Sequence, residues 1–338
     1  MATVLITGAN GEIGHGLLQA LAQQGGHRVV ALDLHAPDDG VKSLCHRFVV
    51  GDILDVPLLR ALAAEHDFDL VFHLAALLST KSEREPTLAH QVNVNGTLNL
   101  LELAVSLARR LGRSVKFLYP SSIAVYGLPD PESKRRAGRV GEDDFLTPRT
   151  MYGINKLYCE QLGRYYALFY RQLDAETPRG RVDFRGIRFP GLISAVTVPT
   201  GGTSDFAPEM LHHAAQGEPY ACFVRPDTRI PFMAMPDAVK ALIGLADAPP
   251  ERLSRPVYNV TSFSPPATEL EARVRAAFPD WRMTYEPDLK RQAILDSWPE
   301  DTDDSAARSD WGWEPDYGLE RAFDEYLLPG VRRRYGSA

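Results

Sequence analysis

Cysteine is scarce in this chain, and long apolar runs are missing. The 338 residues include three cysteines, Cys45, Cys159 and Cys222, which lie far apart and form no Cys-x-x-Cys pair. We therefore expect free thiols in a reducing compartment rather than a disulfide framework. No stretch is long and apolar enough to span a membrane, and the first strand is expected to start at Thr3, which leaves no room for a signal peptide. These absences predict a cytoplasmic protein that does not bind membranes.

An excess of positive charge is also missing. The chain has 37 Lys and Arg against 44 Asp and Glu, a formal net charge of -7, so nucleic acid is not an expected partner. The basic run Arg332–Arg334 is interpreted as a solvated tail. His212 and His213 have no suitably spaced acidic or cysteine ligands, so no metal site is expected. The sequence contains no Walker loop, Gly-x-Ser-x-Gly elbow or His-Glu-x-x-His motif.

Short apolar segments alternate with helical patterns through the first half of the chain. Strands are predicted at Thr3–Thr7, Arg28–Asp33, Arg47–Val50, Leu70–His73, Val115–Tyr119 and Val182–Phe189. Helices are predicted at Ile13–Gln24, Val56–His66, Pro86–Arg110 and Met151–Leu173. This alternation indicates βαβ units, and therefore an α/β fold with a doubly wound parallel sheet of the Rossmann type.

Two regions depart from this regular alternation. Gly127–Arg149 is rich in proline, glycine and charge and is predicted to be a loop. Beyond Pro190 the elements become shorter, with helices predicted near Phe206–Gln216, Pro236–Ala246, Pro266–Ala277 and Leu319–Leu327. We expect residues 1–190 to form a cofactor-binding domain. Residues 191–338 are expected to form mainly a smaller α/β substrate lobe, with some return to the first domain.

A glycine-rich loop joins the first predicted strand to the first helix. Gly8, Gly11 and Gly14 permit a tight turn and a close approach to a pyrophosphate at the helix N-terminus. Such a trio also occurs in ordinary turns, so the interpretation depends on its context. Asp33 ends the second strand, where a carboxylate accepts hydrogen bonds from the ribose of NAD and repels the 2′-phosphate of NADP. A solvated acid at a strand end is the alternative for Asp33; in this context NAD is the expected cofactor.

Further cofactor contacts are expected in this loop and where other strands end, because ligands of open parallel sheets bind at the carboxyl ends of the strands. These residues are Asn10, Glu12 and Ile13 in the glycine loop, Asp52 and Ile53 after the third strand, and Leu74, Ala75 and Ala76 after the fourth.

Tyr152 and Lys156 are four residues apart on a predicted helix and so share one face. A cation near a phenol lowers its pKa, so that the tyrosine can take a proton from a substrate hydroxyl while hydride leaves the same carbon. Ser122, near the end of the fifth strand, can hydrogen-bond the reacting oxygen. The tyrosine–lysine spacing is common by chance, but the order of glycine loop, Asp33, Ser122, Tyr152 and Lys156 is far more specific.

Together these motifs resemble the extended short-chain dehydrogenase/reductase family over nearly the whole chain. The resemblance implies an NAD-dependent enzyme with Ser122, Tyr152 and Lys156 as catalytic residues, Lys156 also anchoring the cofactor ribose. It implies a homodimer through the helices predicted at Pro86–Arg110 and Met151–Leu173. The segment 91–97 is similar to a helix motif of the family, and its Asn93 is expected to order the cofactor side of the site.

The second half resembles the short-chain L-threonine 3-dehydrogenases of this family. The stretches that carry the resemblance are Arg188–Ser194, Gly202–Ala207, Met233–Ala238, Tyr258–Thr261 and Ser297–Glu300. Pro190 and Gly191 stand where nucleotide-sugar epimerases usually have an asparagine that meets the diphosphate. The implied reaction is oxidation of the C3 hydroxyl of L-threonine to 2-amino-3-ketobutyrate. A nucleotide-sugar epimerase or dehydratase, a dehydrogenase of another small hydroxy acid, and a non-enzymatic NAD sensor are the alternatives.

The same resemblance implies a set of substrate-binding residues. Ser79, Thr203 and Ser204 would hold the charged groups of the amino acid, Gly191 and Trp298 would line the pocket, and Pro190 would lie beside the cofactor. Helix capping is the alternative for Thr203 and Ser204, and core packing is the alternative for Trp298.

The chain also departs from the threonine enzymes. Lys81, next to the expected pocket, stands in a segment that differs from theirs. Leu128–Arg139 and Asp174–Arg181 are longer or more charged than usual and are expected to be surface insertions.

Overall fold

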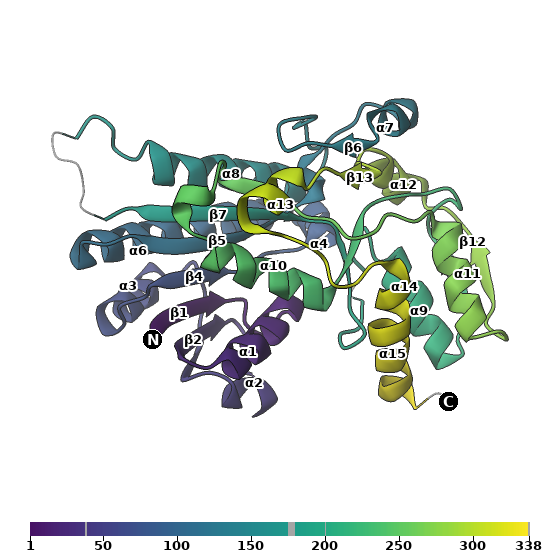
Figure 1. The fold of residues 1–338 in the computed structure, drawn as a ribbon, viewed down its shortest axis with the longest axis horizontal. Coiled ribbons are helices and arrows are strands. Elements are labelled where there is room, and N and C mark those ends of the chain that lie inside the picture. The colour runs from purple at the N-terminus through teal and green to yellow at the C-terminus, as the bar shows by residue number, and fades with distance from the viewer. Residues whose placement is uncertain (38, 175–179, 200, 337–338) are drawn as a thin grey trace.

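A parallel sheet of seven strands runs through the larger part of the molecule in this computed structural model, which describes residues 1–37, 39–174, 180–199 and 201–336 (Figure 1). The strands lie in the order β11 (Val257–Asn259), β7 (Val182–Phe189), β5 (Val115–Ser122), β4 (Leu70–His73), β1 (Ala2–Thr7), β2 (His27–Asp33) and β3 (Arg47–Val50). The order reverses at β1, which pairs in parallel with β2 on one side and with β4 on the other. The predicted Rossmann-type α/β fold is confirmed, and the reversal places a ligand crevice at the carboxyl ends of β1 and β4.

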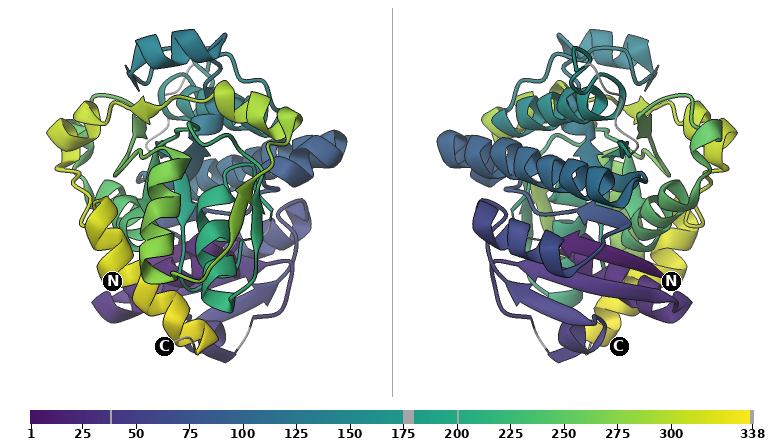
Figure 2. Two further views of the ribbon diagram at one scale, coloured as in Figure 1. Left: turned by 90° about the vertical axis from the view of Figure 1, so that its right-hand side faces the viewer. Right: turned by 90° about the vertical axis from the view of Figure 1, so that its left-hand side faces the viewer.

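Helices cover both faces of this sheet (Figure 2), which explains why its strands are apolar on both sides. Val4 and Ile6 are fully buried in a cluster with residues of α1 (Glu12–Gln24), α10 (Met235–Asp247) and α13 (Ser305–Trp311). Their neighbour Leu5 is buried on the opposite face. That face is covered by α3 (Val56–Glu65), α6 (Gly96–Leu111) and α8 (Met151–Leu168).

The second half of the chain builds a smaller group of elements beside the sheet (Figure 1). Its helices are α9 (Phe206–Gln216), α11 (Ala267–Ala277), α12 (Leu289–Asp296), α14 (Leu319–Arg321) and α15 (Leu328–Tyr335), with the π-helical turn η4 (Ala322–Leu327) between the last two. Short parallel pairs join β8 (Gly191–Ile193) to β10 (Phe232–Ala234) and β9 (Tyr220–Cys222) to β12 (Met283–Tyr285). Later elements return to the large sheet: β11 pairs with β7, α10 packs on α1, and α13 contacts β11.

The boundaries of several helices differ from those predicted from the sequence. The helix predicted at Pro86–Arg110 comprises α5 (Pro86–His90), the π-helical turn η1 (Gln91–Asn95) and α6. The helix predicted to reach Leu173 ends at Leu168, shortly before Arg171, whose φ of 48° is incompatible with a continuing helix. The last predicted helix begins at Leu319 as expected but continues through α15 to Tyr335.

The predicted loop 127–149 contains a helix, α7 (Pro131–Ala137), and a short strand, β6 (Arg139–Val140), which pairs with β13 (Asp301–Thr302). The helix forms because the Asp130 side chain caps it and Pro131 occupies its first position. The expectation of a surface insertion is wrong for part of Leu128–Arg139, because Leu128 and Lys134 are buried. Of the second expected insertion, residues 175–179 lie outside the described residues.

Some short elements were not predicted at all. They include α2 (Asp39–Ser43), α4 (Ser79–Arg84), the 3-10 turns η2 (Ile123–Val125) and η3 (Pro250–Arg252), the helices α12 and α13, and the short strands β8 to β13. None of the helices in the described ranges has the length and apolarity needed to cross a membrane. Cys45, Cys159 and Cys222 are free thiols, and the last two are buried.

Candidate active site

A cleft of about 840 Å³ lies at the carboxyl ends of the sheet strands and is lined by both halves of the chain. Most of the predicted site residues line it. They are Gly8, Asn10, Gly11, Glu12, Ile13, Gly14, Asp33, Asp52, Ile53, Leu74, Ala75, Ala76, Ser79, Ser122, Tyr152, Lys156, Pro190, Gly191, Ser204 and Trp298. Asn93 and Thr203 lie behind this lining. The fold thus brings together residues that are up to 290 positions apart in the sequence, from Gly8 to Trp298.

The glycine loop lies tightly against its surroundings. Gly8 has a φ of +71°, and a Cβ there would lie 2.6 Å from the backbone nitrogen of Ala75. A Cβ on Gly14 would lie 2.4 Å from the carbonyl oxygen of Ala9, so α1 packs closely on the loop. Gly11 stands at the N-cap of α1 and has no side chain that could occupy the amides of the first turn. This is the geometry that a pyrophosphate requires.

Asp33 is held in place by the backbone around it. Its Oδ2 accepts a hydrogen bond from the Asn10 backbone N–H at 3.0 Å, and its Oδ1 accepts one from the His35 N–H at 3.1 Å. The Asn10 side chain in turn donates to the His35 carbonyl at 2.8 Å. The carboxylate therefore has a fixed orientation at the edge of the cleft. The residues present fit a dinucleotide with free ribose hydroxyls.

Glu12 adds an unusual negative charge to this cradle. It stands in the first turn of α1, next to the place where a pyrophosphate would lie. Desolvation in the cleft raises the pKa of its carboxyl, and the charge of Asp205 raises it further. The cleft thus carries acidic groups on both the loop and the facing segment.

Tight packing at the start of α8 sets the position of Tyr152. A Cβ on Gly153 would lie 2.0 Å from the Ala124 carbonyl oxygen, so only glycine lets the helix approach the chain just after β5. Thr150 caps α8 by accepting from the Gly153 N–H at 3.0 Å. Glu83 was not predicted as a site residue; its side chain accepts from the backbone N–H of Met151 at 2.6 Å.

The Ser122, Tyr152 and Lys156 side chains meet in the floor of the cleft. Burial raises the pKa of Tyr152 well above its usual value, and a hydrogen bond with Ser122 partly offsets this. The Lys156 ammonium donates to the Pro120 carbonyl at 2.6 Å and lies 5.5 Å from the centre of the Tyr152 ring. Burial lowers the pKa of Lys156 to about 8. Burial therefore dominates the pKa of Tyr152 in this arrangement, and the role of Lys156 in lowering that pKa stays a prediction.

A buried ion pair supports the strand end that carries Ser122. Arg188 donates to both carboxylate oxygens of Glu160, at 2.9 and 2.6 Å, and both side chains are at most 3% exposed. The Ser121 hydroxyl donates to Glu160 at 2.5 Å. The Tyr126 hydroxyl accepts from Arg188 at 3.0 Å. This network joins β5, α8 and β7 directly beneath the cleft.

Asn93 supports the site from behind. It lies in the π-helical turn η1, and its side-chain oxygen accepts from the Leu77 N–H at 2.8 Å while its amide donates to the Leu77 carbonyl at 3.1 Å. It is 2% exposed and is absent from the cleft lining. Its place fits the ordering of the loop after β4 rather than direct contact with a cofactor.

Some of the residues expected to bind substrate line the cleft, and others support the residues that line it. Thr203 is buried, and its backbone N–H donates to the Ser79 hydroxyl at 3.2 Å. The alternative that Thr203 or Ser204 caps a helix is wrong, because Asp205 is the residue that precedes α9. Trp298 both packs in the core of the second half and lines the cleft. Lys81 is exposed and does not line the cleft.

Sequence reasoning missed one wall of the cleft, formed by Ser194, by the segment 196–199 and by Arg334 of α15. Arg334 donates to the Val196 carbonyl at 2.6 Å, and Arg332 donates to the Ala277 carbonyl at 3.3 Å. The interpretation of Arg332–Arg334 as a solvated tail is therefore wrong for Arg332 and Arg334, whereas Arg333 is exposed. No local pattern marks this wall, because α15 reaches it only through tertiary packing against α9.

A dinucleotide cradle that shares one cleft with a serine, a tyrosine and a lysine defines an oxidoreductase of the short-chain dehydrogenase class. The comparison with known proteins agrees: the chain belongs to the NAD dependent epimerase/dehydratase family, whose sequence pattern matches residues 4–261, and its cofactor is NAD.

Relatives of known activity cover almost all of this chain. The mitochondrial L-threonine 3-dehydrogenase of Bos taurus is 37% identical over 94% of this chain and 79% of its own length. The structure of a monomeric L-threonine 3-dehydrogenase from a metagenome is 38% identical, covering 98% of this chain and 99% of its own, with a TM-score of 0.84. The structure of L-threonine dehydrogenase from Clostridium difficile is 33% identical, covering 99% of each chain, with a TM-score of 0.87.

Proposed function

We propose that this protein oxidises the C3 hydroxyl of L-threonine with NAD to give 2-amino-3-ketobutyrate. The observation that carries the choice of substrate is the path of the chain after β7. Pro190 is followed at once by β8, which pairs with β10, and a Cβ on Gly191 would lie 2.7 Å from the Phe232 ring. This wall projects no amide side chain toward a nucleotide diphosphate. Trp298 limits the space further, so a small substrate is favoured.

The cofactor-binding residues that we propose follow the cleft. NAD would be held by the glycine loop (Gly8, Asn10, Gly11, Glu12, Ile13 and Gly14), by Asp33, by Asp52 and Ile53, by Leu74, Ala75 and Ala76, by Tyr152 and Lys156, and by Pro190, with Asn93 ordering the loop behind them. When bound there, NAD supplies the hydride acceptor.

The reaction needs one proton acceptor from the protein. Tyr152 takes the proton of the substrate hydroxyl as the C3–H bond breaks and the C=O bond forms, and Ser122 holds the reacting oxygen by a hydrogen bond. Lys156 anchors the cofactor ribose. Ser79 and Ser204 contact the charged groups of the substrate, Thr203 supports Ser79, and Gly191 and Trp298 shape the pocket. Because burial raises the pKa of Tyr152, turnover is expected to increase as the pH rises into the alkaline range.

The test is the near-ultraviolet absorbance of NADH formed from NAD and L-threonine. Tyr152→Phe is expected to lower kcat about 100- to 10,000-fold, because it removes the proton acceptor. Tyr165→Phe is a matched control, since Tyr165 lies on the same helix and is 40% exposed. L-serine, 3-hydroxybutyrate, D-erythronate and UDP-glucose complete the panel. Preferred turnover of another hydroxy acid, or epimerisation of UDP-glucose, would overturn the assignment.

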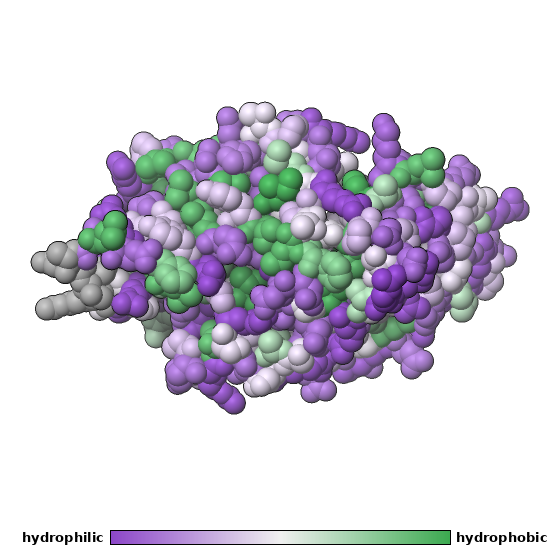
Figure 3. Space-filling model, turned by 90° about the horizontal axis from the view of Figure 1, so that it is seen from above, coloured by the Kyte–Doolittle hydropathy of each residue, from purple (hydrophilic) through white to green (hydrophobic). Residues whose placement is uncertain are grey.

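We also propose that the protein is a homodimer joined through α6 and α8. Apolar side chains gather near the middle of the face seen in Figure 3, and on α8 the exposed residues include Ile154 (48%) and Leu168 (57%). Light scattering during gel filtration tests this, and Ile154→Glu is expected to yield monomers. A wild-type protein that is monomeric in solution, as the metagenomic L-threonine 3-dehydrogenase is, would refute it.

Two broader assignments complete the proposal. We propose two lobes, residues 1–190 and 191–338, divided by the cleft, with β11 and α10 returning to the first. The free thiols of Cys45, Cys159 and Cys222 support a reducing compartment such as the cytoplasm.

A further inference from the structure

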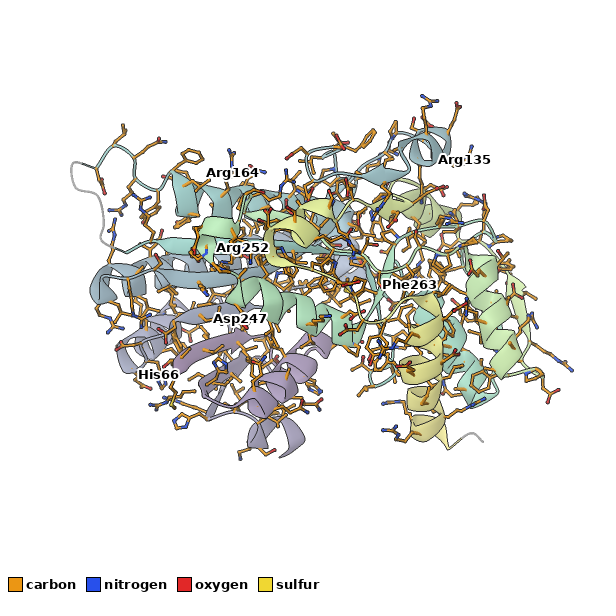
Figure 4. The ribbon with its side chains drawn as sticks, viewed as in Figure 1. His66, Arg135, Arg164, Asp247, Arg252 and Phe263 are labelled. Atoms are coloured by element: carbon orange, nitrogen blue, oxygen red, sulfur yellow. The ribbon has the colours of Figure 1, made fainter. Side chains whose placement is uncertain are left out.

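The short helix α7 has no counterpart in the pattern predicted from the sequence, and it packs against the segment that carries Trp298. Its residue Lys134 is 4% exposed, whereas its neighbours Glu132, Arg135 and Arg136 are exposed. Figure 4 shows Arg135 at the outer edge of the molecule, pointing away from the body. One lysine of this charged helix is therefore directed into the protein.

The Lys134 ammonium contacts the end of α12. It donates a hydrogen bond to the carbonyl oxygen of Leu295 at 2.9 Å. The same oxygen accepts the backbone N–H of Trp298 at 3.2 Å. Lys134 thus shares an acceptor with the backbone of the residue that closes the cleft, and a cation is well placed at the C-terminal end of a helix.

Other residues of the segment 128–140 contact the turn that contains Ser297 and Trp298. The Leu128 N–H donates to the Ser297 carbonyl at 2.8 Å, and β6 pairs with β13 just beyond Trp298. Leu128 lies only six residues after Ser122 in the chain. The segment 128–140 therefore spans directly from the catalytic strand end to the wall formed by Trp298.

The opposite end of α12 reaches the other wall of the substrate region. Arg291 donates to the Gly202 carbonyl at 2.5 Å, next to Thr203 and Ser204. A shift of α12 would therefore displace Trp298 and the 202–204 segment together.

Burial of an ammonium here is costly, and an apolar side chain of the same length would fill the space without that cost. Desolvation lowers the pKa of Lys134 to about 8, despite the favourable charges of Asp296 and Glu300 nearby. A role in packing alone would not require this charge, so the hydrogen bond to the Leu295 carbonyl is the contact to which a positioning role can be assigned.

We propose that Lys134 is a positioning residue for the substrate: its hydrogen bond to Leu295 fixes the turn that carries Trp298, and thereby sets the fit of the small hydroxy amino acid. The inference rests on the proposed function for its substrate. It assigns a role in the site to a helix in the segment that is predicted to be longer or more charged than in the threonine enzymes.

The experiment compares Lys134→Met, which removes the donor and keeps the length, with Arg135→Met on the same helix. For Lys134→Met we expect KM for L-threonine to rise about tenfold, equivalent to about 1.4 kcal/mol, because the hydrogen bond that orders the wall is lost. The kcat at saturation and the Kd for NAD should change less than about twofold, because Tyr152 and the cofactor loop are untouched. Arg135→Met should match the wild type, and Lys134→Arg, which keeps a charged donor, should recover part of the KM.

Hydrogen exchange without substrate supplies a second readout, since the amides of Ser297 and Trp298 are bonded within the turn. These two amides should exchange faster in Lys134→Met than in the wild type. Their exchange rates should be unchanged in Arg135→Met. If the wild type does not oxidise L-threonine, the proposed function fails, while the exchange result still decides whether Lys134 holds the turn. Lys134→Leu, which also removes the donor, serves the same comparison if Lys134→Met does not fold. Unchanged exchange, or a loss of kcat and NAD affinity with KM constant, would overturn the proposal.

Discussion

Neutralising one member of the Glu160–Arg188 pair should be among the most damaging single changes in the protein. Both side chains are at most 3% exposed, and Arg188 also donates to Tyr126 and to the Glu142 carbonyl at 2.6 Å. Glu160→Gln keeps the shape but leaves the buried guanidinium without a countercharge. Breaking a buried pair in this way costs about 3–5 kcal/mol. At about 2 °C per kcal/mol for a chain of this size, Tm should fall by roughly 6–10 °C.

Urea unfolding followed by circular dichroism measures this cost. Glu325→Gln is the matched control, because the Arg321–Glu325 pair has the same charges with both side chains 54% exposed, and it should leave the free energy of unfolding almost unchanged. Replacing both buried partners with apolar residues (Glu160→Leu with Arg188→Met) should cost clearly less than the sum of the single changes. If Glu160→Gln lowers the free energy of unfolding by less than about 1 kcal/mol, the reasoning is refuted, because a buried charge left unpaired should cost more than that.

Three further predictions concern the cofactor loop and the sheet. Gly8→Ala should weaken NAD binding at least about tenfold in calorimetry, because a φ of +71° and a 2.6 Å approach to Ala75 exclude a Cβ; unchanged affinity would contradict the close packing. Glu12→Gln should strengthen NAD binding about three- to tenfold at low salt, and less at high salt, because it removes a like charge beside the pyrophosphate; equal affinity at low salt would show that Glu12 does not face it. His73 is buried between the Thr7 and Thr97 hydroxyls, each at 2.9 Å, and burial lowers its pKa to about 3. As the pH falls below about 6.5, His73 therefore takes up a proton in the unfolded chain but not in the native one. Through this residue the free energy of unfolding should fall by up to about 1.4 kcal/mol for each unit by which the pH is lowered. Unfolding of His73→Gln against the wild type between pH 6.5 and 4.5 isolates this slope, and parallel curves would disprove it.

The sequence by itself determined the architecture and the chemical core of the site. The apolar strands and the glycine loop are local patterns, since a buried parallel strand and a tight turn each require particular residues at adjacent positions. Ser122, Tyr152 and Lys156 were placed by their order relative to β5 and α8. All three line the cleft for which they were predicted.

Only the tertiary structure decided which distant segments complete the cleft. Arg334 lines it because α15 packs on α9, and Asn93 lies behind it because η1 turns its side chain to Leu77. Burial is likewise a property of the folded chain, and it raises the pKa of Tyr152. Tertiary packing places the Lys134 ammonium against the Leu295 carbonyl. Solvation and long-range contact depend on residues far away in the chain, and so no local spacing could show them.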